Sequence, residues 1–142
     1  MSISVLTMDL RGPLFYRPKE ELDPFAYDPA SGEALFCFGL NPSQYRCFEP
    51  GDPYLSPLIF KGEAAAPPSG GAGEDWFQLP RGTYLFAQAR EILARDQWID
   101  MAIEVQQEGL WQRLQPGPRL YLRYLREDGR GVTQVWRPFT GS

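Results

Sequence analysis

A set of aromatic and polar side chains falls on one face of three predicted strands in the second half of the chain. Successive side chains of a strand point to opposite faces, so residues two apart share a face. The set consists of Tyr84, Phe86, Gln88, Tyr121, Arg123, Gln134 and Trp136. Rings with a few polar groups among them are typical of small-molecule sites, where rings contact the ligand and polar groups orient it.

This aromatic face has two interpretations, and both stay open at this stage. In the first, it lines a cleft between the two halves of the chain. The rings of that cleft would come from Trp136, Tyr121, Tyr84 and Trp98, and its polar groups from Gln134 and Arg123. In the second, the face is the inner side of a two-part core, because aromatic side chains are first of all core material.

The absence of histidine narrows the chemistry that the chain can perform. Catalysis by Ser-His-Asp or Cys-His and metal binding by imidazole all need histidine. Two cysteines, Cys37 and Cys47, cannot form a four-cysteine zinc site, and we expect both to be reduced and buried. Glu104 and Glu108 share a helix face, most simply a solvated one. We therefore expect no catalytic residue, no metal and no cofactor.

The charge and the apolar pattern restrict the partners. The net charge is −4, without a cluster of Lys or Arg, so direct binding to nucleic acid is not expected. The sequence shows neither a signal peptide nor a long apolar span, which favours a cytoplasmic protein without membrane contact. The partner is then an apolar or aromatic small molecule or another protein, and a homodimer stays open.

The pattern of elements predicts a single α+β domain, residues 1–142, with a mainly antiparallel sheet. Strands are predicted over 83–88, 119–126 and 132–139, the last two joined by a turn at Asp128-Gly129. One long helix is predicted over about 89–114, because apolar residues recur there at helical spacing. That stripe runs through Ile92, Ile99, Ile103, Leu110 and Leu114, widened by Ala102 and Trp111. The aliphatic sides of the strands, which include Leu85 and Leu122, are expected to face this helix.

The first half of the chain is predicted to be rich in strands. Extended segments are expected at 3–10, 13–16, 34–40 and 55–61, with a short helical turn near 19–25. Residues 63–74 consist mainly of small residues, glycine and proline, and are expected to form a flexible loop. This loop joins a β-rich half, 1–62, to a strand–helix–hairpin half, 75–142.

Three short segments of the second half resemble the GyrI-like family, an effector-binding fold named after a bacterial gyrase inhibitor. They are LPRGTY at 79–84, GPRLY at 117–121 with Tyr124, and VTQVWRP at 132–138. The resemblance implies two strand–helix–hairpin modules around a cleft that binds apolar, often aromatic and cationic, small molecules. Many members carry an acidic residue where this chain has Gln134, and a neutral amide attracts a cation less than a carboxylate does.

These observations lead to three hypotheses for the function. The first is a small-molecule-binding, effector-binding-like domain with an aromatic cleft for an apolar or aromatic ligand. The alternative is a protein-interaction or inhibitor domain, because Trp, Tyr and Arg concentrate binding energy at interfaces. The third is a hydrolase that uses carboxylates or tyrosine.

Overall fold

A computed structural model describes residues 4–11, 14–23, 27, 32–39, 58–64, 77–117 and 119–140. The described strands are β1 (Leu6–Leu10), β2 (Leu14–Pro18), β3 (Ala34–Gly39), β4 (Leu58–Ala64), β5 (Phe77–Leu79), β6 (Gly82–Ala89), β7 (Gln115–Pro116), β8 (Arg119–Glu127) and β9 (Arg130–Thr140). One helix, α1 (Arg95–Trp111), completes the elements of the described part. The fold is α+β, as predicted.

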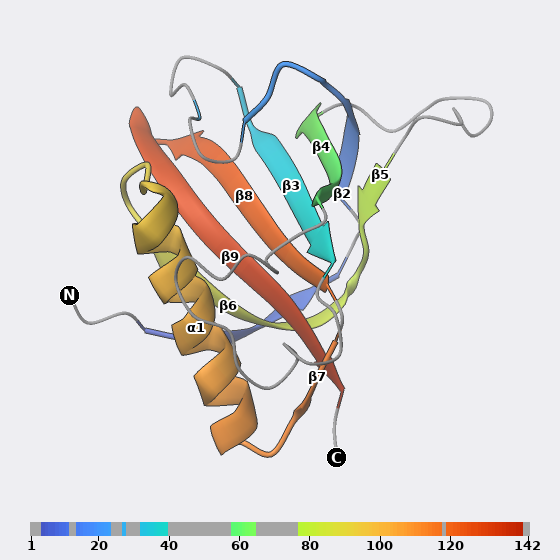
Figure 1. Ribbon diagram of the computed structural model, residues 1–142, viewed down its shortest axis with the longest axis vertical. Coiled ribbons are helices and arrows are strands. Elements are labelled where there is room, and N and C mark those ends of the chain that lie inside the picture. The colour runs from blue at the N-terminus through green and yellow to red at the C-terminus, as the bar shows by residue number, and fades with distance from the viewer. Residues whose placement is uncertain are drawn as a thin grey trace.

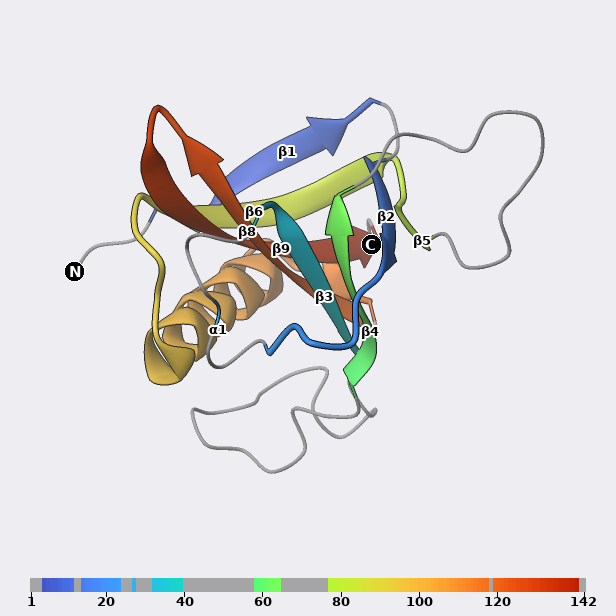
Figure 2. The same ribbon diagram turned by 90° about the horizontal axis from the view of Figure 1, so that it is seen from above.

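The strands form one antiparallel sheet in the order β1-β6-β9-β8-β3-β4-β2-β5, and β7 pairs with the end of β9. The sheet curls into a half-barrel, which Figure 2 shows from above. The curl brings its far end back towards β6, because β5 leads into β6 through Pro80 and Arg81 alone. Helix α1 covers the outer face of the sheet, where it packs on β6 and β9 (Figure 1).

Each face of the sheet has its own apolar cluster. The helix-side cluster joins α1 to the aliphatic residues of the strands, among them Leu85, Leu122 and Val135. The inner cluster lies within the curl and contains Tyr16, Leu35, Cys37, Leu79, Tyr84, Phe86, Tyr121 and Trp136. For β6, β8 and β9, strand alternation predicted that the aliphatic residues face the helix and that the aromatic set lies on the opposite side, and this is confirmed. The helix-side cluster also contains rings, among them Phe36, Phe38 and Tyr124.

Helix α1 is shorter than predicted at both ends. Residues 82–89 form strand β6, so the helix begins at Arg95, where the Gln97 side chain accepts a hydrogen bond from the Ala94 N–H at 2.9 Å. The buried stripe runs through Trp98, Ile99, Ala102 and Val105. Ile103 lies at the edge of this stripe and is half-buried, and Trp111 is exposed rather than part of it.

The sequence predictions for residues 1–74 are confirmed only in part. Strands appear in all four segments predicted for the first half, and Lys19–Glu21 belongs to a turn. The described residues of this half contain no helix that would make a second strand–helix–hairpin module. Glu63 and Ala64, assigned to the flexible loop, belong to β4 instead, while 65–74 lie outside the described residues. Cys37 is free and buried as expected; Cys47 lies outside the described residues.

Candidate functional site

The predicted site residues of β6, β8 and β9 meet on the inner face of the sheet. Tyr121 pairs with Trp136 across β8 and β9, and Trp136 pairs with Phe86 across β9 and β6. The Trp136 ring stands edge-on to Tyr84 and Phe86, with centroids 5.5 and 4.7 Å away. Tyr121 is edge-on to Tyr84 at 6.2 Å. The alternation of the strands therefore brings these four rings together.

These rings pack as a core rather than as the walls of an open cleft. Trp136 is 4% exposed, and Tyr84 and Tyr121 are equally buried. Burial raises the pKa of Tyr121 to about 12, and it raises the pKa of the Tyr84 hydroxyl above its usual range. Tyr84 also donates a hydrogen bond to the Pro80 carbonyl. Of the two interpretations of the aromatic face, the structure supports the second, in which the face forms part of a buried core.

Polar residues form a layer beside the rings, one pair further along the strands. Arg123 pairs with Gln134, and Gln134 pairs with Gln88. Arg123 Nη1 donates to Gln134 Oε1 at 2.8 Å, and Gln134 Nε2 donates to Gln88 Oε1 at 2.8 Å. Gln134 Oε1 also accepts a hydrogen bond from Trp136 Nε1 at 3.0 Å. This arrangement links the two polar residues predicted for the site to the ring beside them.

Two residues that the sequence analysis missed, Tyr16 and Glu33, complete this polar layer. Arg123 Nε donates to Glu33 Oε2 at 3.0 Å and to the Tyr16 hydroxyl at 3.1 Å, while Tyr16 donates to Glu33 Oε2. Burial raises the pKa of the Tyr16 hydroxyl, and Arg123 only partly opposes this. Burial acts to lower the pKa of Arg123, but Tyr16 and Glu33 raise it overall. Arg123, on β8, is therefore a charged group whose partners lie on β2, on β9 and at Glu33, the residue before β3.

Trp98 does not join the other predicted site residues. It is fully buried in α1 within the helix-side cluster, where its ring lies 5.5 Å from that of Phe38. The sheet itself separates it from the inner rings, because the two clusters occupy opposite faces. The sequence could not reveal this, since the phase of α1 against the sheet depends on tertiary packing.

An open groove lies on the helix side, between the end of α1 and β6. It has a volume of about 550 Å³ and is lined by Thr7, Thr83, Tyr84, Leu85, Gln112, Leu114 and Phe139. Strand pairing explains part of the lining: Thr7 lies opposite Leu85 across β1 and β6. Among the six residues predicted for a ligand site, Tyr84 alone contributes to this α1–β6 groove.

The end of α1 forms one wall of the groove. Arg113 has a positive φ of 62°, and its N–H donates to the Leu110 carbonyl at 3.0 Å. The Leu114 N–H donates to the Gly109 carbonyl at 2.9 Å. These two bonds are those of a Schellman motif, which usually has glycine at the position of Arg113. The motif reverses the chain after the helix and places Leu114 in the groove wall.

Buried hydrogen bonds hold the opposite wall, which contains Phe139. Arg137 is buried, and its Nη1 donates to Gln106 Oε1 of α1 at 2.7 Å. Its Nε and Nη2 donate to the Gly117 carbonyl at 3.1 and 2.9 Å. The guanidinium carbon lies 5.8 Å from the centre of the Phe139 ring. Arg137 thus ties β9 to the helix and to the segment after β7, beside the ring that lines the groove.

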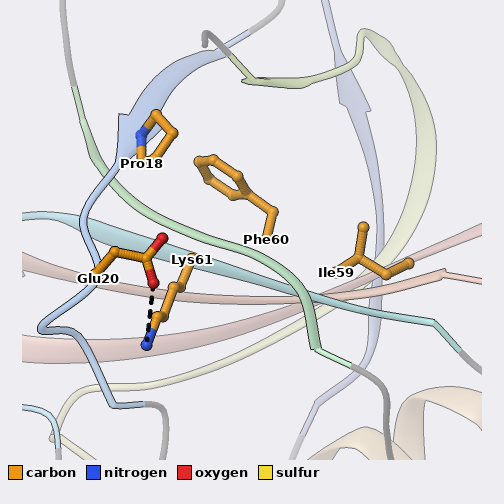
Figure 3. A pocket seen from close by; sticks show the side chains of 5 residues that line it. All are labelled: Pro18, Glu20, Ile59, Phe60 and Lys61. Carbon is orange, nitrogen blue, oxygen red and sulfur yellow. Dashed lines mark ion pairs between the residues drawn. The ribbon is translucent and has the colours of Figure 1, made fainter.

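A second hollow lies beside β2 and β4, towards the end of the sheet that is farthest from β1 in the strand order. Its volume is about 350 Å³, and it is lined by Pro18, Glu20, Ile59, Phe60 and Lys61 (Figure 3). The dashed line in Figure 3 is the ion pair between Lys61 Nζ and Glu20 Oε2, at 4.0 Å. This hollow is smaller than the α1–β6 groove, and an ion pair already engages both of its charged groups.

No protein-family model matches the chain, and no curated protein matches it either. In the part of the chain that the structure describes, no three of the Cys, Asp and Glu residues lie close enough to hold a metal ion. Nor does that part include a helix with the length and apolar character needed to cross a membrane.

Proposed function

We propose that the protein is a small-molecule-binding domain whose ligand, apolar or aromatic, occupies the α1–β6 groove. The observation that carries this proposal is the groove itself. Its volume of about 550 Å³ falls within the range of roughly 300–1,000 Å³ that is usual for small-molecule sites. An effector-binding role of the GyrI-like kind belongs to the same proposal, and it rests on the three segments quoted above.

The composition of the groove favours this class of ligand. Leu85, Leu114 and Phe139 supply apolar surface from β6, from the turn after α1 and from β9. Two hydroxyls, of Thr7 and Thr83, and the amide of Gln112 supply polar groups that can orient a ligand. No charged side chain lines the groove among the described residues. An uncharged or weakly polar aromatic molecule therefore fits this lining better than an ion does.

In this proposal the inner cluster supports the sheet, whereas the sequence analysis expected its residues to bind the ligand. Its rings and its polar layer hold β6 and β9 in the positions from which Leu85 and Phe139 reach the groove. Because Gln134 Oε1 already accepts hydrogen bonds from Arg123 and Trp136, it is engaged within the protein. We therefore place the ligand on the helix side of the sheet and assign the inner residues a structural role.

A variant that fills the groove tests the proposal. Thr83 is exposed and lines the groove, so Thr83→Phe adds a ring there without disturbing a core. The probe is phenylnaphthylamine, an uncharged aromatic dye whose fluorescence rises in apolar surroundings. We expect the wild-type protein to bind the dye and Thr83→Phe to bind it at least about tenfold more weakly, a loss of about 1.4 kcal/mol.

The matched control is Gln78→Phe, which adds the same ring at an exposed position of β5 outside the groove. It should leave the affinity for the dye unchanged. Equal affinities of the wild type and both variants would mean that the dye binds elsewhere. No binding by the wild type at all would also count against the proposal.

A further inference from the structure

Strand β1 is an open edge of the sheet. It stands at the end of the strand order and pairs with β6 on one side, while no other described strand pairs with it. Figure 2 shows it outside β6, away from the rest of the sheet. Leu6, on this strand, is 54% exposed. An open edge offers unpaired N–H and C=O groups to another extended chain.

A stripe of α1 faces Val5, the residue before β1, across a hollow. The hollow has a volume of about 390 Å³ and is lined by Val5, Glu104, Gln107, Glu108 and Trp111. The four helix residues follow one another at spacings of three, one and three, so they share one helix face. Trp111 is 84% exposed, which is unusual for the largest apolar side chain. Exposed tryptophan is a frequent anchor of protein interfaces.

The charge of this hollow is of one sign. Among the residues that the structure describes, both ionisable residues of the lining, Glu104 and Glu108, are carboxylates, and no Lys or Arg contributes to it. Among the described residues neither carboxylate belongs to an ion pair; Glu108 Oε2 accepts a hydrogen bond from Gln112 Nε2 at 3.0 Å. The charge therefore complements a basic partner and repels an acidic one.

We infer that this surface, formed by β1, Glu104, Glu108 and Trp111, binds an extended basic segment of another protein. The segment adds a strand to the open edge of β1. Its Lys or Arg side chains stand at alternate positions, which share one face of the strand, so that their charged ends face Glu104 and Glu108 and their aliphatic stems pack on Trp111. This inference does not depend on the small-molecule proposal, because Trp111 and the two carboxylates lie outside the lining of the α1–β6 groove.

The same features disfavour a second copy of this chain as the occupant. A symmetric dimer places the same patch of both subunits in one contact. Two copies of an acidic hollow would then meet, and the described residues of either lining supply no cation to compensate them. The net charge of −4 adds to the repulsion.

The test uses a short labelled peptide in which lysine alternates with valine, and fluorescence anisotropy to measure its binding to the full chain. The comparison peptide has glutamate in place of every lysine. We expect the lysine peptide to bind and the glutamate peptide to bind at least about tenfold more weakly. Methylation of the backbone nitrogens of the lysine peptide should abolish binding, because it removes the donors that pair with β1.

Variants of the protein locate the contact. The double variant Glu104→Gln/Glu108→Gln should weaken the lysine peptide about tenfold, and Trp111→Ala should weaken it by a similar factor. Glu127→Gln, which removes an exposed carboxylate from the far end of β8, should have no effect. Equal binding of the two peptides, or equal binding by wild type and the double variant, would overturn the inference. A dimer in sedimentation analysis that Trp111→Ala dissociates would overturn it in favour of a second copy.

Discussion

Removing the Trp136 ring tests whether the inner aromatic face is a core. Trp136 is 4% exposed, stands edge-on to two rings and donates a hydrogen bond to Gln134. Replacing a buried Trp or Phe by Ala costs about 3–5 kcal/mol through lost transfer energy and the cavity left behind. We expect Trp136→Ala to lie at the upper end, because two edge-on ring pairs and one buried hydrogen bond are lost as well.

Urea unfolding followed by far-ultraviolet circular dichroism measures this loss. Trp111→Ala is the matched control, because it removes the same side chain from an exposed position and should change the free energy of unfolding by under about 0.5 kcal/mol. If Trp136→Ala leaves too little folded protein, Trp136→Phe keeps a ring and should lose only about 1–2 kcal/mol. A loss below about 1 kcal/mol for Trp136→Ala, or equal losses for the two alanine variants, would refute the core.

Three further expectations concern the helix, its end and the inner cluster. Ile99→Ala should lower the free energy of unfolding in urea by about 2–5 kcal/mol, because Ile99 is fully buried. Ile103→Ala should lower it clearly less, because Ile103 is half-buried. Equal losses would mean that the helical phase is wrong. Arg113→Gly should raise the melting temperature and add about 0.5–1 kcal/mol to the free energy of unfolding, because glycine adopts a positive φ without steric cost. A lowered melting temperature would argue against the turn. Burial raises the pKa of the Cys37 thiol from 9.0 to about 11. As the pH rises, the unfolded chain therefore loses this proton before the folded protein does. The free energy of unfolding should fall as the pH rises from 9 to 11. Cys37→Ala should flatten that part of the profile, and an unchanged profile would contradict a buried thiol.

Strand alternation made much of the fold predictable from the sequence. Residues two apart share a face whatever the strand order, so the aromatic and aliphatic faces of β6, β8 and β9 could be separated without knowing which strands pair. The turn between β8 and β9 was equally accessible. Asp128 and Gly129 both have positive φ, 53° and 77°, as the Asp-Gly pair of a tight hairpin requires.

The partners of Arg123 and the α1–β6 groove could not be predicted, because they depend on contacts between segments that are distant in the sequence. Tyr16 and Glu33 lie far along the chain from Arg123, and nothing local marks them as its partners. The α1–β6 groove depends on a Schellman turn with arginine in place of the usual glycine, so the sequence carried no signal for it. Apolar periodicity also continued across the boundary between β6 and α1, which is why the predicted helix was too long.

Backbone amide chemical shifts recorded during a titration with phenylnaphthylamine test the ligand site most directly. Binding in the α1–β6 groove should shift the amides of Thr7, Thr83, Leu85, Gln112, Leu114 and Phe139 and leave those of the inner rings nearly unchanged. The dye should produce no such shifts in Thr83→Phe. Shifts that gather instead on Tyr121, Gln134 and Trp136 would place the ligand within the inner cluster and contradict the proposed site.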